Sequence, residues 1–123
     1  MTTHALVSIV DDDESVRESL PDLVRQLGFA ARAFPSAEAF LASEFVGATR
    51  CLLLDIAMPG MSGPDLQREL VNRRQMIPII FITASGDRAI RSQLLADGAV
   101  ECLLKPFSET ALVEALNAAV RKD

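Results

Sequence analysis

The sequence predicts an α/β fold in which helices cover both faces of a parallel sheet. Five short apolar runs recur along the chain, and each is followed by a segment with apolar residues at helical spacing. The runs are nearly continuously apolar, which indicates strands buried on both faces. Such strands alternating with amphipathic helices are typical of a single α/β domain, and we expect residues 1–123 to form one.

The expected strands have the usual length of five or six residues. They span Ala5–Val10, Phe29–Phe34, Cys51–Asp55, Ile79–Thr83 and Val100–Leu104.

The expected helices start at residues that cap helix N-termini, and Gly follows two of them. The first spans Glu14–Leu27 and ends before Gly28, and the second is a short segment from the cap Ser36 to Ser43. The third starts at the capping-box pair Ser62 and Asp65. The fourth spans Arg88–Asp97, with Asp87 as its cap and Gly98 after it, and the fifth follows Ser108.

Composition and charge limit the classes of function that this chain can have. The formal charge of −5 and the pI of about 4.8 argue against nucleic-acid binding by this segment. No apolar run reaches the ~18 residues of a membrane span, and no secretory signal opens the chain. We therefore expect a cytoplasmic domain that binds neither nucleic acid nor membrane.

Charged residues follow three of the expected strands. Asp11, Asp12 and Asp13 follow the first, Asp55 ends the third, and Lys105 follows the fifth. The carboxyl ends of parallel strands meet at one edge of a sheet, where open α/β folds bind ligands. Clustered carboxylates at a buried edge are costly unless a cation neutralises them. These acids with a hard cation, together with the lysine, predict a site for a phosphoryl group.

The acids after the first strand also have a simpler interpretation as helix caps. Asp13 and Glu14 stand where N-cap and first-turn acids complement the helix dipole, and we assign them that role. For Asp12 we favour metal ligation. Oxygen ligands from one or two carboxylates suit Mg²⁺ better than Zn²⁺.

Four motifs, in their order along the chain, resemble those of the bacterial two-component response-regulator receiver domain. Their residues are most similar to those of its FixJ-type branch. The resemblance covers about residues 5–120. It implies a CheY-like, flavodoxin-like (βα)5 three-layer sandwich with strand order 2-1-3-4-5. The motifs are Asp11-Asp12, Asp55 with the loop Met58–Gly63, Thr83-Ala84 and Lys105-Pro106-Phe107.

The resemblance implies a signalling switch and not an enzyme that acts on other substrates. Asp55 would accept a phosphoryl group from a phosphohistidine on a sensor histidine kinase. Lys105 would pair with Asp55 and then with a phosphoryl oxygen, and its peptide bond to Pro106 would be cis. Thr83 would supply the hydroxyl that binds a phosphoryl oxygen after transfer. The domain would thereby promote only its own phosphorylation and dephosphorylation.

The resemblance also implies a divalent cation, Mg²⁺ or Mn²⁺ in its place. Asp12 and Asp55 would bind the ion directly, Asp11 would act through a coordinated water, and the backbone carbonyl of Ala57 would complete the protein ligands.

One residue departs from the family at the output step. Cys102 stands where the family usually has Tyr or Phe, the ring that swings inward when the threonine hydroxyl moves. A cysteine is too small to reproduce that motion. We expect the output surface of the fourth helix, fifth strand and fifth helix to respond through the backbone of residues 84–88. The space left by the ring would be filled by neighbours or stay open as a shallow groove.

The two cysteines are expected to be free, buried thiols. Cys51 and Cys102 lie on expected strands that the implied order separates by one strand, near 10 Å apart. That is beyond the ~7 Å Cα limit for a disulfide.

Two other classes of protein remain as alternatives. A haloacid-dehalogenase-type aspartyl-phosphate hydrolase also combines a strand-end Asp with Mg²⁺, but it needs a second acid two residues later, where Ala57 stands. A flavodoxin-like FMN binder needs a phosphate loop after the first strand, where the three acids would repel the phosphate.

Partners follow from the resemblance alone. They are a sensor histidine kinase, a C-terminal DNA-binding output domain outside this chain that would control transcription, and a second copy in a phosphorylation-dependent homodimer.

Overall fold

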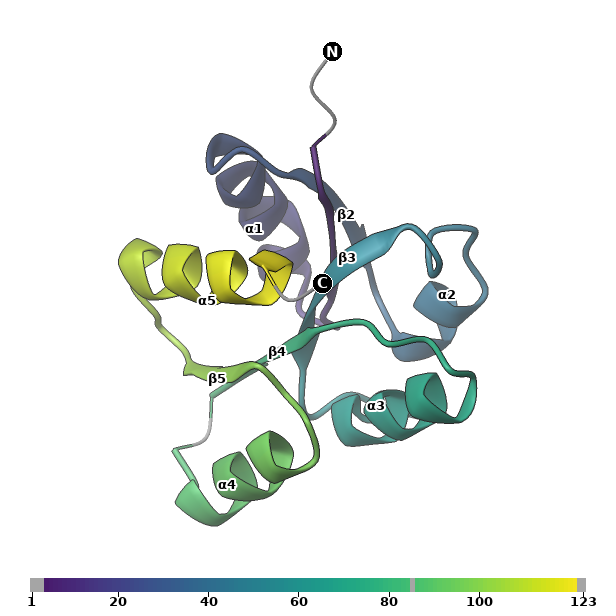
Figure 1. Cartoon of the computed structure of the whole chain (residues 1–123). Helices are drawn as coiled ribbons and strands as arrows, with labels where there is room; N and C mark the ends of the chain where they lie inside the picture. Colours follow the sequence, from purple (N-terminus) through teal and green to yellow (C-terminus); the bar gives the residue numbers. More distant parts are fainter. Residues whose placement is uncertain (1–3, 85, 122–123) are drawn as a thin grey trace.

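The computed structural model describes residues 4–84 and 86–121 and contains a five-stranded parallel sheet in the order β2-β1-β3-β4-β5 (Figure 1). This arrangement confirms the predicted fold class and strand order. The strands are β1 (Leu6–Val10), β2 (Ala30–Phe34), β3 (Thr49–Asp55), β4 (Ile79–Thr83) and β5 (Glu101–Leu104).

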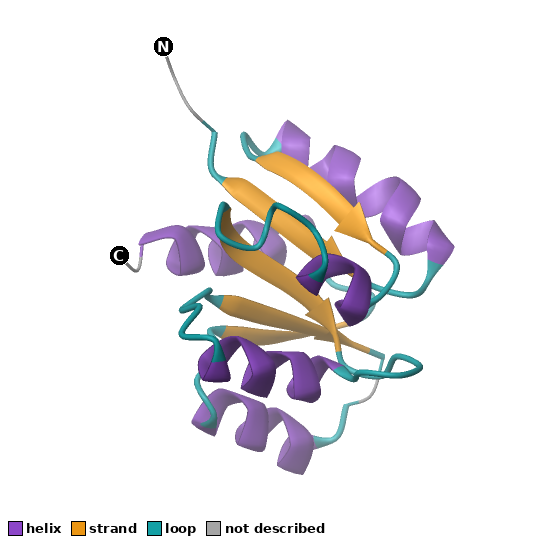
Figure 2. Ribbon diagram, turned by 90° about the vertical axis from the view of Figure 1, so that its right-hand side faces the viewer, coloured by secondary structure: helices purple, strands orange, loops and turns teal. Residues whose placement is uncertain are grey.

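Helices cover both faces of the sheet, with α1 and α5 on one side and α2, α3 and α4 on the other (Figure 1). In Figure 2 the five strands point the same way, and the described chain starts and ends on the side away from their arrowheads. The helices are α1 (Glu14–Gln26), α2 (Ala37–Leu41), α3 (Gly63–Asn72), α4 (Arg88–Ala96) and α5 (Glu109–Arg121).

The core is split into two clusters by the sheet, because successive strand residues point to opposite faces. On β3, Cys51 and Leu53 pack toward α1 and α5, whereas Leu52 and Leu54 pack toward the other three helices. All four are fully buried. Cys102 belongs to the second cluster, so the two free cysteines lie on opposite faces, and burial raises the pKa of the Cys51 thiol to about 12.

The predicted caps are confirmed. Asp13 accepts a hydrogen bond from Ser15 N at 2.9 Å, Ser36 from Ala39 N at 3.0 Å, and Asp87 from Ala89 N at 2.9 Å. Ser62 and Asp65 form the reciprocal capping box that starts α3. These caps fix where each helix leaves the carboxyl edge of the sheet.

The largest boundary errors are two residues, at the end of α2, which stops at Leu41 and not at Ser43, and at the start of β3, which begins at Thr49 and not at Cys51. The polar pair Thr49-Arg50 hides the strand in the sequence. Thr49 is nevertheless buried, and its hydroxyl lies 2.7 Å from the Ser8 hydroxyl on β1, so the buried polar groups satisfy each other. Of the helices in the described residues, none has the length and apolarity required to span a membrane.

Candidate functional site

The carboxyl edge of the sheet brings together every site residue predicted from the sequence. The strand register places Asp55 beside Ile82 of β4 and Thr83 beside Leu104 of β5, so the strand ends are level. These ends border one cavity of about 390 Å³. It is lined by Asp11, Asp12, Asp13, Asp55, Ile56, Ala57, Thr83, Ala84, Ile90 and Lys105.

Three carboxylates in this cavity lie close enough to share one cation. One oxygen from each of Asp11, Asp12 and Asp55 lies within 4.8 Å of the others. Asp11 is buried, Asp55 is half-buried, and Asp12 is exposed at the mouth. Hard oxygen donors of this kind fit Mg²⁺, which binds through one or two carboxylates and keeps several waters. The donor set therefore fits the predicted ion, with Asp12 the acid most open to solvent.

Asp11 is held by four hydrogen bonds. Its Oδ1 accepts from Asp13 N at 2.9 Å, and its Oδ2 accepts from Lys105 Nζ at 3.1 Å. Its carbonyl oxygen accepts from Arg17 Nη1 at 3.0 Å, and its own amide donates to Phe34 O at 3.2 Å. Both carboxylate oxygens of Asp11 thus already have donors, an arrangement compatible with action on a cation through water.

The ion pair of Lys105 corrects one prediction. The family resemblance implied a pair with Asp55, but among the described residues the Lys105 ammonium forms its ion pair with Asp11. Asp11 is 1% exposed and Lys105 is 26% exposed by side chain. The more deeply buried carboxylate has lost more hydration, so it gains more from the counter-charge. The predicted cis peptide bond between Lys105 and Pro106 is confirmed.

The pKa of Asp55 is raised from its ordinary 3.8 to about 6. Burial is the largest cause, the negative charge of Asp11 adds to it, and a hydrogen bond with Asp12 and its charge add less. The positive charge of Lys105 acts in the opposite direction. A cation among the three acids would favour the ionised carboxylate, which is the form that can act as a nucleophile.

The loop that follows Asp55 is closed tightly onto the strand end. Gly63 N donates to Ile56 O at 2.9 Å, and a Cβ at Gly63 would lie 2.3 Å from Asp55 O, so this position accepts only glycine without movement. Met58 is buried and fixes the middle of the loop in the core. Ala57 lies between Ile56, whose carbonyl binds Gly63 N, and the buried Met58.

Thr83 lies where the acidic cavity meets a second cavity of about 350 Å³ between α4 and β5. Cys102 and Leu104 line this second cavity together with Ile90 and Arg91 of α4. The space beside Cys102 thus stays open, which is one of the two outcomes expected from the sequence. Burial raises the pKa of the Cys102 thiol, which disfavours the reactive thiolate.

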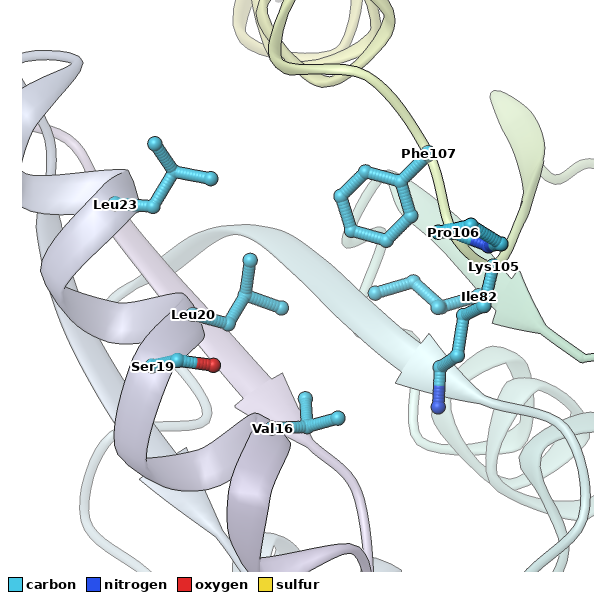
Figure 3. A pocket seen from close by; sticks show the side chains of 8 residues that line it. All are labelled: Val16, Ser19, Leu20, Leu23, Ile82, Lys105, Pro106 and Phe107. Carbon is cyan, nitrogen blue, oxygen red and sulfur yellow. The ribbon is translucent and has the colours of Figure 1, made fainter.

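A third cavity, of about 540 Å³, lies beside the site between α1 and the β5–α5 loop (Figure 3). Lys105 borders both this cavity and the acidic one. Apolar side chains from both sides face the gap in Figure 3, namely Val16, Leu20 and Leu23 on α1, and Ile82, Pro106 and Phe107 opposite them.

Two polar residues that touch the site or its loop were missed by sequence reasoning. Arg17 of α1 binds the Asp11 carbonyl, and Glu38 of α2 binds Met61 N at 3.0 Å. Neither stands next to a motif residue in the sequence. Both look like ordinary exposed helix charges, and only the tertiary arrangement shows their contacts.

Comparisons with known proteins agree with this geometry. The family model for the response regulator receiver domain matches residues 7–117, so the chain belongs to that family. Nodulation protein W of Bradyrhizobium diazoefficiens is 43% identical over 122 residues, which cover 99% of this chain and 54% of that protein. Transcriptional regulatory protein FixJ of Rhizobium meliloti is 41% identical over 117 residues, 95% of this chain and 57% of that protein.

A solved structure titled FixJ-N has a TM-score of 0.87 to this chain at 40% identity, covering 100% of this chain and 98% of that one. The chain is thus a receiver domain of a two-component response regulator, and its relatives include transcriptional regulators. It spans about half the length of the curated relatives it matches. These matches give no support to the hydrolase alternative.

Proposed function

We propose that Asp55 is the phosphoacceptor of this receiver domain. The observation that carries the proposal is the convergence of three carboxylates and Lys105 in one cavity at the carboxyl edge of the sheet. Asp55 is the one of the three acids that ends a strand at the middle of this edge, half-open to the cavity.

In the proposed reaction a carboxylate oxygen of Asp55 attacks the phosphorus of a phosphohistidine. The new P–O bond forms an acyl phosphate as the P–N bond breaks, and the electron pair of that bond returns to the imidazole. Lys105 is within reach of the acidic cluster and would leave Asp11 to bind a phosphoryl oxygen. The small Ala84 at the mouth leaves room for the donor's imidazole.

Mg²⁺ would neutralise the carboxylates and the phosphoryl oxygens during transfer. Asp12 and Asp55 would bind it directly, the carbonyl of Ala57 would be a third protein ligand, and Asp11 would act through a water. The exposure of Asp12 and the donors already bound to both carboxylate oxygens of Asp11 support this division of roles. Mn²⁺ would substitute, because it accepts the same oxygen donors.

Thr83 would carry the signal away from the site. Its position between the two cavities supports a hydroxyl that binds a phosphoryl oxygen and thereby changes the surface of α4, β5 and α5. In a longer protein of the kind represented by the relatives, that surface would control a C-terminal DNA-binding output domain, and it would also serve a phosphorylation-dependent homodimer.

The proposed phosphodonor is a sensor histidine kinase in the cytoplasm. The apolar cavity in Figure 3 supports kinase docking there, because Lys105 lines both this cavity and the acidic one. This activity would be limited to the domain's own phosphorylation and dephosphorylation, with residues 1–123 acting as one receiver domain.

Incubation with acetyl phosphate tests the proposal without a kinase. The wild-type chain with Mg²⁺ should gain the mass of one phosphoryl group, measured on the intact protein. Asp55→Asn should gain none, and EDTA should prevent the gain in wild type. Phosphate uptake by Asp55→Asn, or uptake that is indifferent to EDTA, would contradict the proposal.

A further inference from the structure

The β3–α3 loop, residues 56–62, is tied to α2 by a single charged side chain. Glu38 Oε2 accepts a hydrogen bond from Met61 N at 3.0 Å, across 23 residues of sequence. We propose that Glu38 is a positioning residue for the metal site. It acts through this loop, and the inference rests on the proposed function of the acidic cavity.

The backbone of the loop is shaped to receive the Glu38 carboxylate. Gly60 has a φ of +75°, which side-chain-bearing residues rarely adopt. A Cβ at Gly60 would lie 2.6 Å from Glu38 Oε2, closer than nonbonded atoms approach. The carboxylate therefore lies against bare backbone at Gly60 while it binds the next amide. Glycine at position 60 therefore suits this contact both because of its positive φ and because it has no Cβ.

The loop needs such a tie because its other fixed points lie at its ends and in its first half. Gly63 N closes the loop onto Ile56 O, and Met58 is buried in the core. Pro59 and Gly60 are exposed. Glu38 holds this second half, so that the loop that carries the Ala57 carbonyl is fixed along its whole length. The carbonyl of Ala57 is the proposed metal ligand that no side chain could replace.

Glu38 also has an ordinary role that the experiment must separate. It stands in the first turn of α2, where a negative charge complements the helix dipole. Ser36 already caps that helix by accepting from Ala39 N at 3.0 Å. Glu38→Gln removes the charge but keeps an acceptor oxygen for Met61 N. Glu38→Ala removes both.

Mg²⁺ titration of ¹⁵N-labelled protein tests the inference. The chain has no Trp or Tyr, so amide shifts replace intrinsic fluorescence as the readout. Glu44→Ala is the matched control, because it removes the same charge from the exposed turn after α2. We expect Glu38→Ala to raise the Mg²⁺ dissociation constant about three- to fivefold, the size of one surface hydrogen bond. Glu38→Gln and Glu44→Ala should stay near the wild-type value.

A second readout separates loop order from helix stability. The Met61 amide should exchange with solvent about threefold faster in Glu38→Ala, whereas the amides of α2 should exchange alike in Glu38→Ala and Glu38→Gln. If wild type binds Mg²⁺ and Glu38→Ala binds it equally well, the inference is wrong and the proposed function stands. If wild type shows no saturable Mg²⁺ binding, the proposed function fails, and this inference fails with it.

Discussion

The acidic cavity and the α4–β5 cavity meet at Thr83, yet they are built in opposite ways. In the acidic cavity, Asp11 is fixed by several partners, because its carboxylate accepts from Asp13 N and Lys105 Nζ and its carbonyl oxygen accepts from Arg17. In the α4–β5 cavity, the small Cys102 leaves space, and Leu104 is 51% exposed at its rim.

The difference between the two cavities matches the difference between two tasks of this receiver domain, phosphoryl transfer and output. Phosphoryl transfer depends on atoms held to fractions of an ångström, which requires dense packing and saturated hydrogen bonding. An output surface must move and meet partners, so open space and exposed apolar side chains are tolerated there. Mutations in the acidic cavity should accordingly impair stability and phosphoryl transfer most, and mutations in the α4–β5 cavity should impair them least.

Filling the space behind Asp55 should have the largest effect. Gly63→Ala places a Cβ 2.3 Å from Asp55 O and 3.0 Å from the Phe81 ring, so backbone must shift. We expect a loss of about 2–3 kcal/mol in the free energy of unfolding, measured by urea denaturation. Gly47→Ala is the control, because nothing lies within 4 Å of the added atom. Equal effects of the two substitutions on the free energy of unfolding would show that the region around Gly63, behind Asp55, is not tightly packed.

Removing the exposed acid should abolish the response to metal. At Mg²⁺ about tenfold above its dissociation constant, wild type should gain about 1.4 kcal/mol, seen as a rise in Tm. Asp12→Ala should show almost none of this rise. Without metal it should be more stable than wild type by roughly 0.5–1 kcal/mol, because one repulsive charge is gone. A wild-type-like Mg²⁺ response in Asp12→Ala would exclude Asp12 as a ligand.

Without metal, stability should depend on pH through Asp55. Its pKa is raised from 3.8 to about 6 in the folded state, so the folded state binds the proton more tightly than the unfolded state. The resulting stabilisation is complete below about pH 3.8 and is lost as pH rises through about 6. Because Asp55 is half-open to solvent, we expect a loss of only about 1 kcal/mol between pH 5 and 7.5.

Chemical denaturation in EDTA at several pH values measures this effect. Asp55→Asn should lack that part of the pH dependence, and saturating Mg²⁺ should reverse the loss in wild type. A wild-type curve that runs parallel to that of Asp55→Asn would rule out the raised pKa.

Changing Cys102 should have the smallest effect on stability and transfer. The cavity of about 350 Å³ beside Cys102 gives a ring room, so Cys102→Phe should change the free energy of unfolding by less than about 1 kcal/mol. Cys102→Ser should keep phosphorylation-induced dimerisation, measured by sedimentation. If Cys102→Ser abolishes dimerisation while Asp55 is still phosphorylated, the cysteine is itself the switch. The expected movement of residues 84–88 includes Ser85, which lies outside the described residues.

The residues alone were enough to predict the five strands, the caps and the charged residues of the acidic cavity, and the family resemblance added Thr83 and Ala57. Strand-end positions such as that of Asp55 are readable because continuous apolar runs end there. Contacts between distant segments were not readable. The Lys105 ion pair depends on the relative burial of two carboxylates, and the Glu38 bond depends on the path of the loop at Gly60. The start of β3 was hidden by Thr49, whose hydroxyl is satisfied by the Phe45 carbonyl and by the Ser8 hydroxyl on a neighbouring strand.

The central claim is that one particular carboxylate, Asp55, receives the phosphoryl group. An acyl phosphate is reduced by borohydride to the alcohol, which would convert the modified aspartate to homoserine and mark its position permanently. After acetyl phosphate and Mg²⁺ treatment followed by borohydride, peptide mapping should find homoserine at position 55 and unmodified Asp11, Asp12 and Asp13. Homoserine at any of those three positions, or at none of the four, would contradict the assignment.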